Sequence, residues 1–187
     1  YPAADHGRAT IAGGYANELL NSQYGFIGGG ILNVISGEGN SYSSIVGGQL
    51  NTISASIRAF IGGGTENLLK GSYSFLGGGE DNVITAAAHS FLGGGVRNTM
   101  SGASYGTLGG GMDNGISGQY SFLGGGRGNE IRNAGGAASL HYNVLVGGQD
   151  NYVSGGHSFL GGGYLNRVRG SRSTIGGGTS NNLSGIY

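Results

Sequence analysis

Residues 75–84 read Phe75-Leu76-Gly77-Gly78-Gly79-Glu80-Asp81-Asn82-Val83-Ile84, and this pattern decides the fold because it occurs eleven times. Each copy has an aliphatic residue, two or three glycines, two variable residues, an asparagine, one variable residue and a second aliphatic residue. The asparagines that mark the copies are Asn17, Asn33, Asn51, Asn67, Asn82, Asn98, Asn114, Asn129, Asn151, Asn166 and Asn181. Eight of the ten intervals between them are 15 or 16 residues, and the other two are 18 and 22. So short a repeat is smaller than a domain, and we expect each copy to be one coil of a stack.

The composition is unusual, with 46 glycines among 187 residues. Collagen is excluded because the glycines come as doublets and triplets about every 15 residues, not at every third position. Disorder is disfavoured because the aliphatic residues keep fixed places in the repeat, which an unpacked chain has no reason to do. We therefore expect a single folded repeat domain over residues 1–187, with its coils at about 8–186.

The charge is sparse and balanced, with nine acidic and nine basic residues, so the composition gives no electrostatic case for a nucleic-acid partner. No stretch is apolar enough to insert directly into a membrane, and no N-terminal signal segment is present. Cysteine is absent, which excludes disulfides and cysteine metal sites. We expect the chain to be a piece of a longer protein.

Two positions of the repeat are always apolar. The first holds Ile11, Ile27, Ile45, Ile61, Leu76, Leu92, Leu108, Leu123, Leu145, Leu160 and Ile175. The second, eight residues later, holds Leu19, Ile35, Ile53, Leu69, Ile84, Met100, Ile116, Ile131, Val153, Val168 and Leu183. This pattern predicts two short strands per coil, each of which points one aliphatic side chain inward.

Two glycine positions precede the variable pair in every coil, from Gly13-Gly14 to Gly177-Gly178. A position that never accepts even a methyl group indicates a positive φ angle or a very close approach of another backbone segment. We expect these glycines at a sharp corner between the two strands. The alternative, a phosphate-binding loop, needs a following helix and a Lys-Ser/Thr pair.

The asparagine position has a structural interpretation. Identical amides stacked at the repeat distance can hydrogen-bond along the stack as a ladder, and asparagine also suits turns that leave backbone groups unpaired. A ligand-binding role for the asparagines is the alternative.

An aromatic pattern precedes the first aliphatic position. All six phenylalanines stand immediately before it, at Phe26, Phe60, Phe75, Phe91, Phe122 and Phe159. Two residues earlier stand only Tyr, His or Arg, including Tyr73, Tyr105 and Tyr120. Because strand side chains alternate between faces, we expect both positions to point outward and the small residue between them to point inward.

An exposed row of phenylalanines is rare on monomers. Burying only two aliphatic side chains per coil also stabilises the fold by less than the conformational entropy that is lost when a whole coil becomes ordered. We therefore predict a homo-oligomer whose interface contains the six phenylalanines together with Tyr73, Tyr105 and Tyr120. An aromatic ligand-binding face is the alternative.

The two long coils predict surface loops, which often carry binding residues. The candidate ligand contacts in these loops are Glu38, Asn133, Ser139 and His141. Near the C-terminus, Arg167, Arg169 and Arg172 have no acidic sequence neighbour and are candidates for contact with an acidic glycan or another anionic surface. Tolerated insertions and solvated arginines are the structural alternatives.

No catalytic, cofactor or metal site emerges from the sequence, so we expect a protein that is not an enzyme. No serine lies in a Gly-x-Ser-x-Gly strand-to-helix setting. The calcium-binding nonapeptide repeat requires a nine-residue period with aspartate in each turn, which differs from the repeat here.

The run from Tyr120 to Ile131, Tyr-Ser-Phe-Leu-Gly-Gly-Gly-x-x-Asn-x-Ile, and the matching run from Tyr73 to Ile84 resemble the head repeats of trimeric autotransporter adhesins. The resemblance is to the YadA-like heads with Gly-Gly-Gly repeats and covers about residues 8–186. It implies a left-handed parallel β-roll, three chains side by side, and adhesion at the tip of a cell-surface fibre. The partner would be a host or prey surface glycan or matrix protein.

The resemblance further implies an extracellular location, anchored in the outer membrane through a stalk and barrel that this sequence does not contain. Two alternatives remain. One is a phage or viral tail-fibre receptor-binding module. The other is an ice-binding β-roll, which needs a flat, regular face of small polar residues, whereas the outward position here mixes Phe with Thr. A fibre-borne glycan hydrolase would need paired carboxylates at a cleft.

Overall fold

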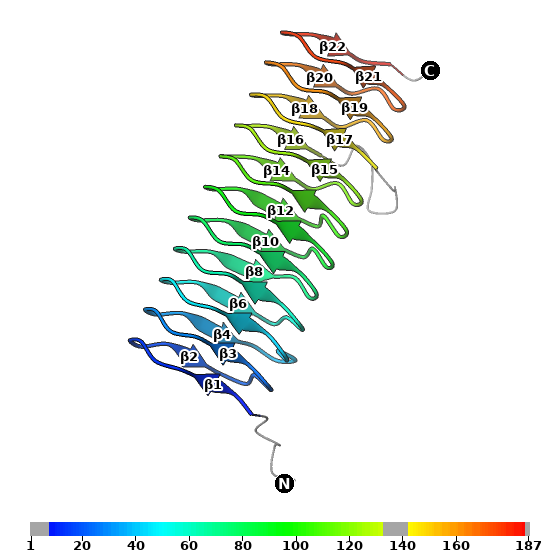
Figure 1. Cartoon of the computed structure of the whole chain (residues 1–187). Helices are drawn as coiled ribbons and strands as arrows, with labels where there is room; N and C mark the ends of the chain where they lie inside the picture. The colour runs from blue at the N-terminus through cyan, green and yellow to red at the C-terminus, as the bar shows by residue number, and fades with distance from the viewer. Residues whose placement is uncertain (1–7, 133–141, 186–187) are drawn as a thin grey trace.

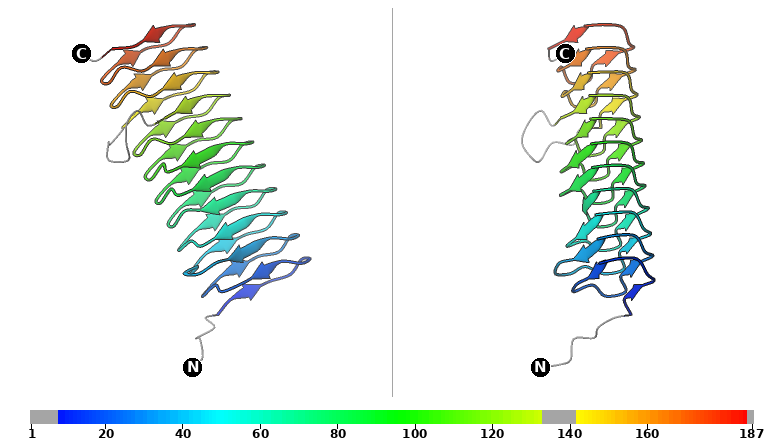
Figure 2. Two further views of the ribbon diagram at one scale, coloured as in Figure 1. Left: turned by 180° about the vertical axis from the view of Figure 1, so that it is seen from behind. Right: turned by 90° about the vertical axis from the view of Figure 1, so that its left-hand side faces the viewer.

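The computed structural model describes residues 8–132 and 142–185. This part of the chain is all-β, and its parallel strands stack as a β-solenoid (Figure 1). The strands form two sheets of eleven, one from the odd-numbered and one from the even-numbered strands. Figure 2 shows the two sheets as neighbouring layers of one straight rod.

The odd-numbered strands form the phenylalanine sheet, so called because the phenylalanines lie on it. Its strands are β1 (Thr10–Ile11), β3 (Phe26–Ile27), β5 (Ser44–Ile45), β7 (Phe60–Ile61), β9 (Phe75–Leu76), β11 (Phe91–Leu92), β13 (Thr107–Leu108), β15 (Phe122–Leu123), β17 (Val144–Leu145), β19 (Phe159–Leu160) and β21 (Thr174–Ile175).

The even-numbered strands form the opposite sheet. Its strands are β2 (Glu18–Leu19), β4 (Val34–Ser36), β6 (Thr52–Ser54), β8 (Leu68–Lys70), β10 (Val83–Thr85), β12 (Thr99–Ser101), β14 (Gly115–Ile116), β16 (Glu130–Ile131), β18 (Tyr152–Val153), β20 (Arg167–Val168) and β22 (Asn182–Leu183).

The strand register confirms both predicted apolar positions. Ile61, Leu76 and Leu92 are successive partners in the phenylalanine sheet, and Leu69, Ile84 and Met100 are partners in the opposite sheet. These aliphatic side chains meet between the sheets and are fully buried along the middle of the rod. In the first coil Ile11 has a neighbouring coil on one side only and is 42% exposed.

Each coil turns at two corners, and the first one, the asparagine corner, joins a strand of the phenylalanine sheet to the next strand of the opposite sheet. Gly95 lies at this corner with φ +96°. A Cβ atom on Gly95 would lie 2.1 Å from the carbonyl oxygen of Gly111 in the next coil. Both predicted reasons for an invariant glycine, the positive φ angle and the close backbone approach, are confirmed here.

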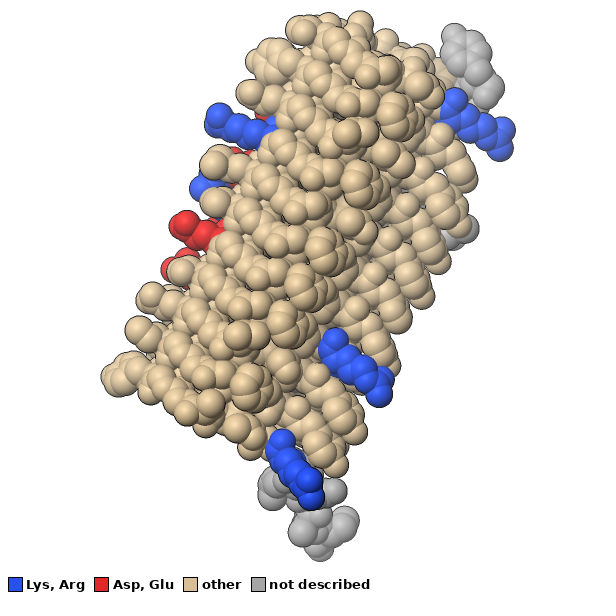
Figure 3. Space-filling model, viewed as in Figure 1, with Lys and Arg blue, Asp and Glu red and all other residues tan. Residues whose placement is uncertain are grey.

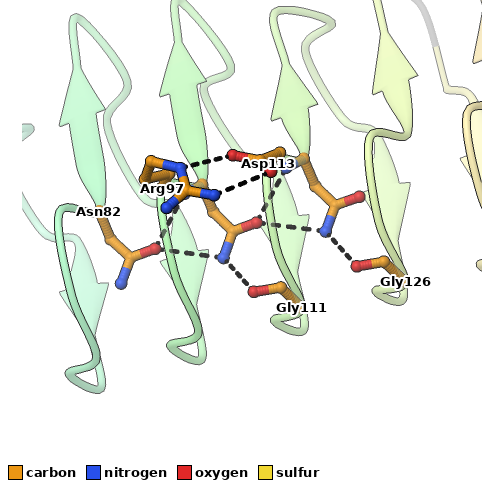
Figure 4. A network of polar contacts seen from close by, with 7 residues as sticks. Asn82, Arg97, Gly111, Asp113 and Gly126 are labelled. Atoms are coloured by element: carbon orange, nitrogen blue, oxygen red, sulfur yellow. Dashed lines mark hydrogen bonds and ion pairs between the residues drawn. The ribbon is translucent and has the colours of Figure 1, made fainter.

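The asparagine ladder is also confirmed (Figure 4). Asn98 Nδ2 donates to Asn82 Oδ1 at 3.1 Å and to the carbonyl oxygens of Gly94 and Gly111 at 3.0 and 2.9 Å. The backbone N–H of Asn98 donates to the same Asn82 oxygen at 3.0 Å. From Asn17 to Asn181, each asparagine Oδ1 accepts the backbone N–H of the next asparagine. Because these amides are buried, the ladder supplies partners that water cannot.

The second corner, the tyrosine corner, leads back from the opposite sheet to the phenylalanine sheet. It too has a left-handed residue, such as His89 with φ +56°, followed by a buried residue, here Ser90. Ser90 Oγ donates to the carbonyl oxygen of Ala103 at 2.9 Å, and the Ser90 N–H donates to Ser74 Oγ at 3.0 Å. Serine thus does at this corner, with one oxygen, part of what asparagine does at the other.

Candidate interaction surfaces

The outer side of the tyrosine corner carries a continuous stack of planar side chains, which we call the tyrosine ladder. Successive aromatic rings along it have centroids 4.8 to 5.3 Å apart. Its members are Tyr24, Tyr42, Arg58, Tyr73, His89, Tyr105, Tyr120, Tyr142 and His157. The Arg58 guanidinium fills the gap, 5.4 Å from the Tyr42 centroid and 5.5 Å from that of Tyr73.

Stacking offsets a backbone cost at these positions. Each of these residues has φ in the left-handed region, for example +58° at Tyr73 and +59° at Tyr105. For side chains other than glycine this conformation costs roughly 1–2 kcal/mol, whereas an aromatic pair contributes about 0.5–1.5 kcal/mol beyond its area burial. Because each ring packs against its neighbours, the surface left for a partner is the ring edges and the tyrosine hydroxyls.

The phenylalanine row lies on the outer face of the phenylalanine sheet, as predicted. Phe60, Phe75 and Phe91 stack in sequence, with centroids 5.1 and 5.2 Å apart. Their rings lie over the glycine two residues later; a Cβ on Gly77 would be 3.5 Å from Phe75 Cε1. Phe60 is half-buried, and the other five phenylalanines are each 38–43% exposed.

Phe26, Phe122 and Phe159 lie on the same row without a phenylalanine neighbour. Phe26 pairs with Thr10 and Ser44, and Phe122 pairs with Thr107 and Val144. The outward positions of this sheet hold no charged residue. In Figure 3 the middle of the face toward the viewer has no charged side chains, and the blue and red side chains lie along its edges.

Both aromatic positions face outward, but strand alternation explains only the phenylalanine. The strands begin at the phenylalanine position, as in β3 and β9, so the preceding Tyr/His/Arg residue lies in the corner. Its side chain points outward because of its left-handed φ angle. The small residue between the two positions is buried, as predicted, at Ser43, Ser74 and Ser121.

Of the predicted loop contacts, only Glu38 lies in the described residues. It is exposed in a turn between Gly37 and Asn40, where the Asn40 N–H donates to the Gly37 carbonyl oxygen at 3.3 Å. This turn holds the extra residues of the 18-residue coil. Asn133, Ser139 and His141 lie outside the described residues.

The predicted cluster of Arg167, Arg169 and Arg172 is divided by the fold. Arg167 lies in β20 and Arg169 directly after it, both on the opposite sheet. Arg172 lies at the tyrosine corner with φ +55°, where its N–H donates to the Gly156 carbonyl oxygen. The chain turns between Arg169 and Arg172, so the three do not form one site.

The opposite sheet brings Arg167 and Arg169 into a shallow hollow together with residues of two earlier coils. The hollow has a volume of about 410 Å³ and is lined by Gly128, Glu130, Arg132, Asp150, Asn151, Tyr152, Leu165, Arg167 and Arg169. Arg167 and Arg169 therefore do have acidic neighbours, which belong to other coils. Comparing the position after the asparagine between successive coils would have revealed Glu130, Tyr152 and Arg167 as a set.

Besides the hollow, an exposed ion pair lies on the outer side of the asparagine corner. Arg97 and Asp113 form a two-point ion pair, with Nε–Oδ1 at 2.7 Å and Nη2–Oδ2 at 3.1 Å (Figure 4). The hydrogen bond and charge of Asp113 raise the pKa of Arg97 above its ordinary value, and the hydrogen bond from Arg97 lowers the pKa of Asp113. Both side chains are solvent-exposed, so the pair is screened and contributes little to stability.

Within residues 8–132 and 142–185, no group of three or more His, Cys, Asp or Glu side chains is arranged to hold a metal ion. The same residues contain no helix long and apolar enough to span a bilayer. No protein-family model matches the chain, and no curated protein matches it. Function is therefore inferred from the surfaces of the molecule: the phenylalanine row, the tyrosine ladder and the hollow.

Proposed function

We propose that this chain is the head of a homotrimeric cell-surface fibre that adheres to a glycan or protein on another cell. In this proposal three left-handed β-rolls lie side by side, and the chain acts by binding, without catalysis. The location is extracellular, with anchorage in the outer membrane through segments other than this one.

The exposed phenylalanine row is the observation that carries the proposal. A row of rings that runs along one uncharged sheet face is an apolar surface of the kind that monomers rarely leave in water. Covering it with the same row of a neighbouring copy buries apolar area at about 25 cal/mol per Å². The tyrosine hydroxyls then lie at the border of that interface, where they keep access to water.

The mass of the chain in solution tests the trimer. Light scattering is expected to give about three times the chain mass of 18.6 kDa. Replacing Phe75 and Phe91 together with serine removes two neighbouring rings from the row and should give monomers or insoluble protein. The matched control replaces Leu68 and Val83, on the opposite sheet, with serine and should leave the trimer intact. A monomeric wild-type chain, or an unchanged trimer in the Phe75/Phe91 variant, would contradict the proposed interface.

Adhesion is tested with the purified trimer on immobilised glycans, matrix proteins and whole cells. Saturable binding to cells or to one of these surfaces is expected. Thermal hysteresis in the absence of such binding would instead indicate an ice-binding roll. Saturable binding confined to bacterial cells, lost when their surface receptor is stripped, would favour a phage-type fibre.

A further inference from the structure

The hollow on the opposite sheet lies over β16, β18 and β20. Glu130, Tyr152 and Arg167 are successive register partners, so their side chains stand in one outward row. A second row runs beside it, two positions further along each coil, and contains Arg132, Ser154 and Arg169. The hollow therefore has an acidic, an aromatic and a basic residue along one side and two arginines along the other.

The hollow exists because small residues stand between large ones. Ser154 is buried, with only 7% of its surface exposed, and it separates Arg132 from Arg169. Two coils of a parallel stack span roughly 10 Å, so Arg132 and Arg169 line the hollow from coils about that far apart. Gly128 lines the neighbouring border and adds no side chain.

Some charged side chains in the hollow have partners within the protein, and others do not form ion pairs with the described residues. Arg132 forms an ion pair with Glu130, and its guanidinium lies 6.0 Å from the centroid of the Tyr152 ring. The hydrogen bond and charge of Glu130 raise the pKa of Arg132 above its ordinary value. Asp150 Oδ2 accepts a hydrogen bond from Gln149 Nε2 at 3.0 Å. Arg167 and Arg169 are exposed and form no ion pair with any described residue.

We propose that this hollow binds an acidic saccharide, whose carboxylate or sulfate group is held by Arg167 and Arg169 while a sugar ring packs beside Tyr152. Guanidinium groups pair with planar or tetrahedral anions through two parallel hydrogen bonds. An aromatic side chain offers apolar contact to the C–H face of a sugar and keeps its hydroxyl for a polar one. A shallow, open site with a few polar groups suits one or two residues of a longer glycan.

This inference rests on the proposed function, because it names the ligand of the adhesive head. The phenylalanine row lies on one sheet and the hollow on the other, so covering the row in a trimer leaves the hollow open. Three hollows per trimer then raise the apparent affinity for a glycan-coated surface well above that of one site.

Isothermal titration of the full chain tests the ligand. The probes are a sulfated heparin hexasaccharide, a carboxylated oligogalacturonate hexasaccharide and the neutral maltohexaose. One or both acidic probes are expected to bind and the neutral probe is not; which acidic probe binds identifies the anion. If neither acidic probe binds, or if the neutral probe binds equally, the proposed ligand class is wrong.

Variants test the site. Arg167→Gln with Arg169→Gln should weaken binding of the acidic probe about tenfold or more, as expected for lost charge-assisted hydrogen bonds. The control Arg8→Gln with Arg127→Gln removes the same two positive charges from arginines that do not line the hollow, and should change affinity less than about twofold. Equal losses in both would show general attraction of anions and overturn the site. Tyr152→Ala should weaken binding while preserving its dependence on the anion; unchanged affinity would remove the tyrosine from the site.

The same samples separate this inference from the proposed function. Light scattering reports the trimer and cell binding reports adhesion, independently of the titration. An adhesive trimer that binds no acidic saccharide overturns only the hollow's ligand. A monomer that still binds the acidic probe through Arg167 and Arg169 overturns only the trimeric head.

Discussion

The two corners of each coil share a backbone plan but differ in how much variation they accept. Across the asparagine corner the first and second core residues are eight positions apart in all eleven coils. Across the tyrosine corner the spacing varies, and all differences in coil length arise there, including the 18- and 22-residue coils. The Asn98 amide donates to two glycine carbonyl oxygens and to Asn82 and also accepts from Asn114, whereas the Ser90 hydroxyl donates to the carbonyl oxygens of Ala88 and Ala103. The more completely bonded corner is the one whose length never changes.

The largest difference in stability between the two corners is expected from inserting four residues, Gly-Ser-Gly-Ser, at each corner. Between Gly102 and Ala103, at the tyrosine corner, the insertion should lower the free energy of unfolding by about 1 kcal/mol, the cost of a longer loop. Between Val96 and Arg97 it displaces Asn98 from the ladder and should cost about 4 kcal/mol or more, because several buried hydrogen bonds are lost. Thermal unfolding followed by circular dichroism measures both. Equal effects would show that the corners do not differ.

The second test compares two glycines with positive φ angles. Gly95→Ala adds a methyl group against the Gly111 carbonyl oxygen and should destabilise the protein by about 3–5 kcal/mol, through backbone strain and overpacking. Gly102, at the tyrosine corner, has φ +68° and open space around its Cβ position, so Gly102→Ala should cost only about 1–2 kcal/mol. Urea midpoints of the two variants should therefore differ clearly. A Gly95→Ala protein as stable as Gly102→Ala would show that the backbones at the asparagine corner are not so closely apposed.

The third test compares the two buried polar residues. Asn98→Ala leaves the Asn114 N–H and the Gly94 carbonyl oxygen without their partner and removes one of the two donors to the Gly111 carbonyl oxygen, and should cost about 3 kcal/mol. Ser90→Ala removes one donor and should cost about 1 kcal/mol. The two variants can be compared directly because Ser90 and Asn98 are both buried and lie in the same coil. Equal losses would indicate that the ladder contributes no more than a serine row.

The smallest effect is expected at the Arg97–Asp113 ion pair, which lies on the solvent-exposed side of the asparagine corner. The folded-state pKa of Asp113 is lowered by its hydrogen bond to Arg97 and lies below the unfolded value. The stabilisation is therefore present above the ordinary aspartate pKa and is lost as pH falls through the lowered one. Asp113→Asn should lower the thermal midpoint by about 1 °C or less at pH 7 and have no effect in strong acid. A large shift at pH 7, persisting in high salt, would contradict the exposed, screened character of the pair.

Most of the fold was predictable because its determinants lie within one coil. Invariant aliphatic, glycine and asparagine positions report burial, backbone conformation and side-chain ladders, and the register, Gly95 and Asn98 confirm each of them. The left-handed conformation of the tyrosine position was missed because alternation was extended beyond the strand. Residue preference does not report φ there, since Tyr and Arg, which fill most of these positions, do not favour that conformation.

The candidate sites were less predictable because they join residues of different coils. Arg167, Arg169 and Arg172 are close in sequence, but the corner separates the third from the others. Glu130 and Tyr152 lie beside Arg167 only because of the sheet register. In the sequence the longest coil separates Glu130 from Tyr152. Phe26 to Phe159 could be recognised as an outward row, since that property depends on each coil alone.

The asparagine ladder also gives the rod a direction. Every Oδ1 faces the following coil, so each cut between coils exposes amide oxygens on one side and backbone N–H donors on the other. Two such surfaces fit each other in only one orientation, whichever coils they come from. A coil copied or removed as a unit therefore leaves a matching junction, and length can change by whole repeats while the cross-section stays the same.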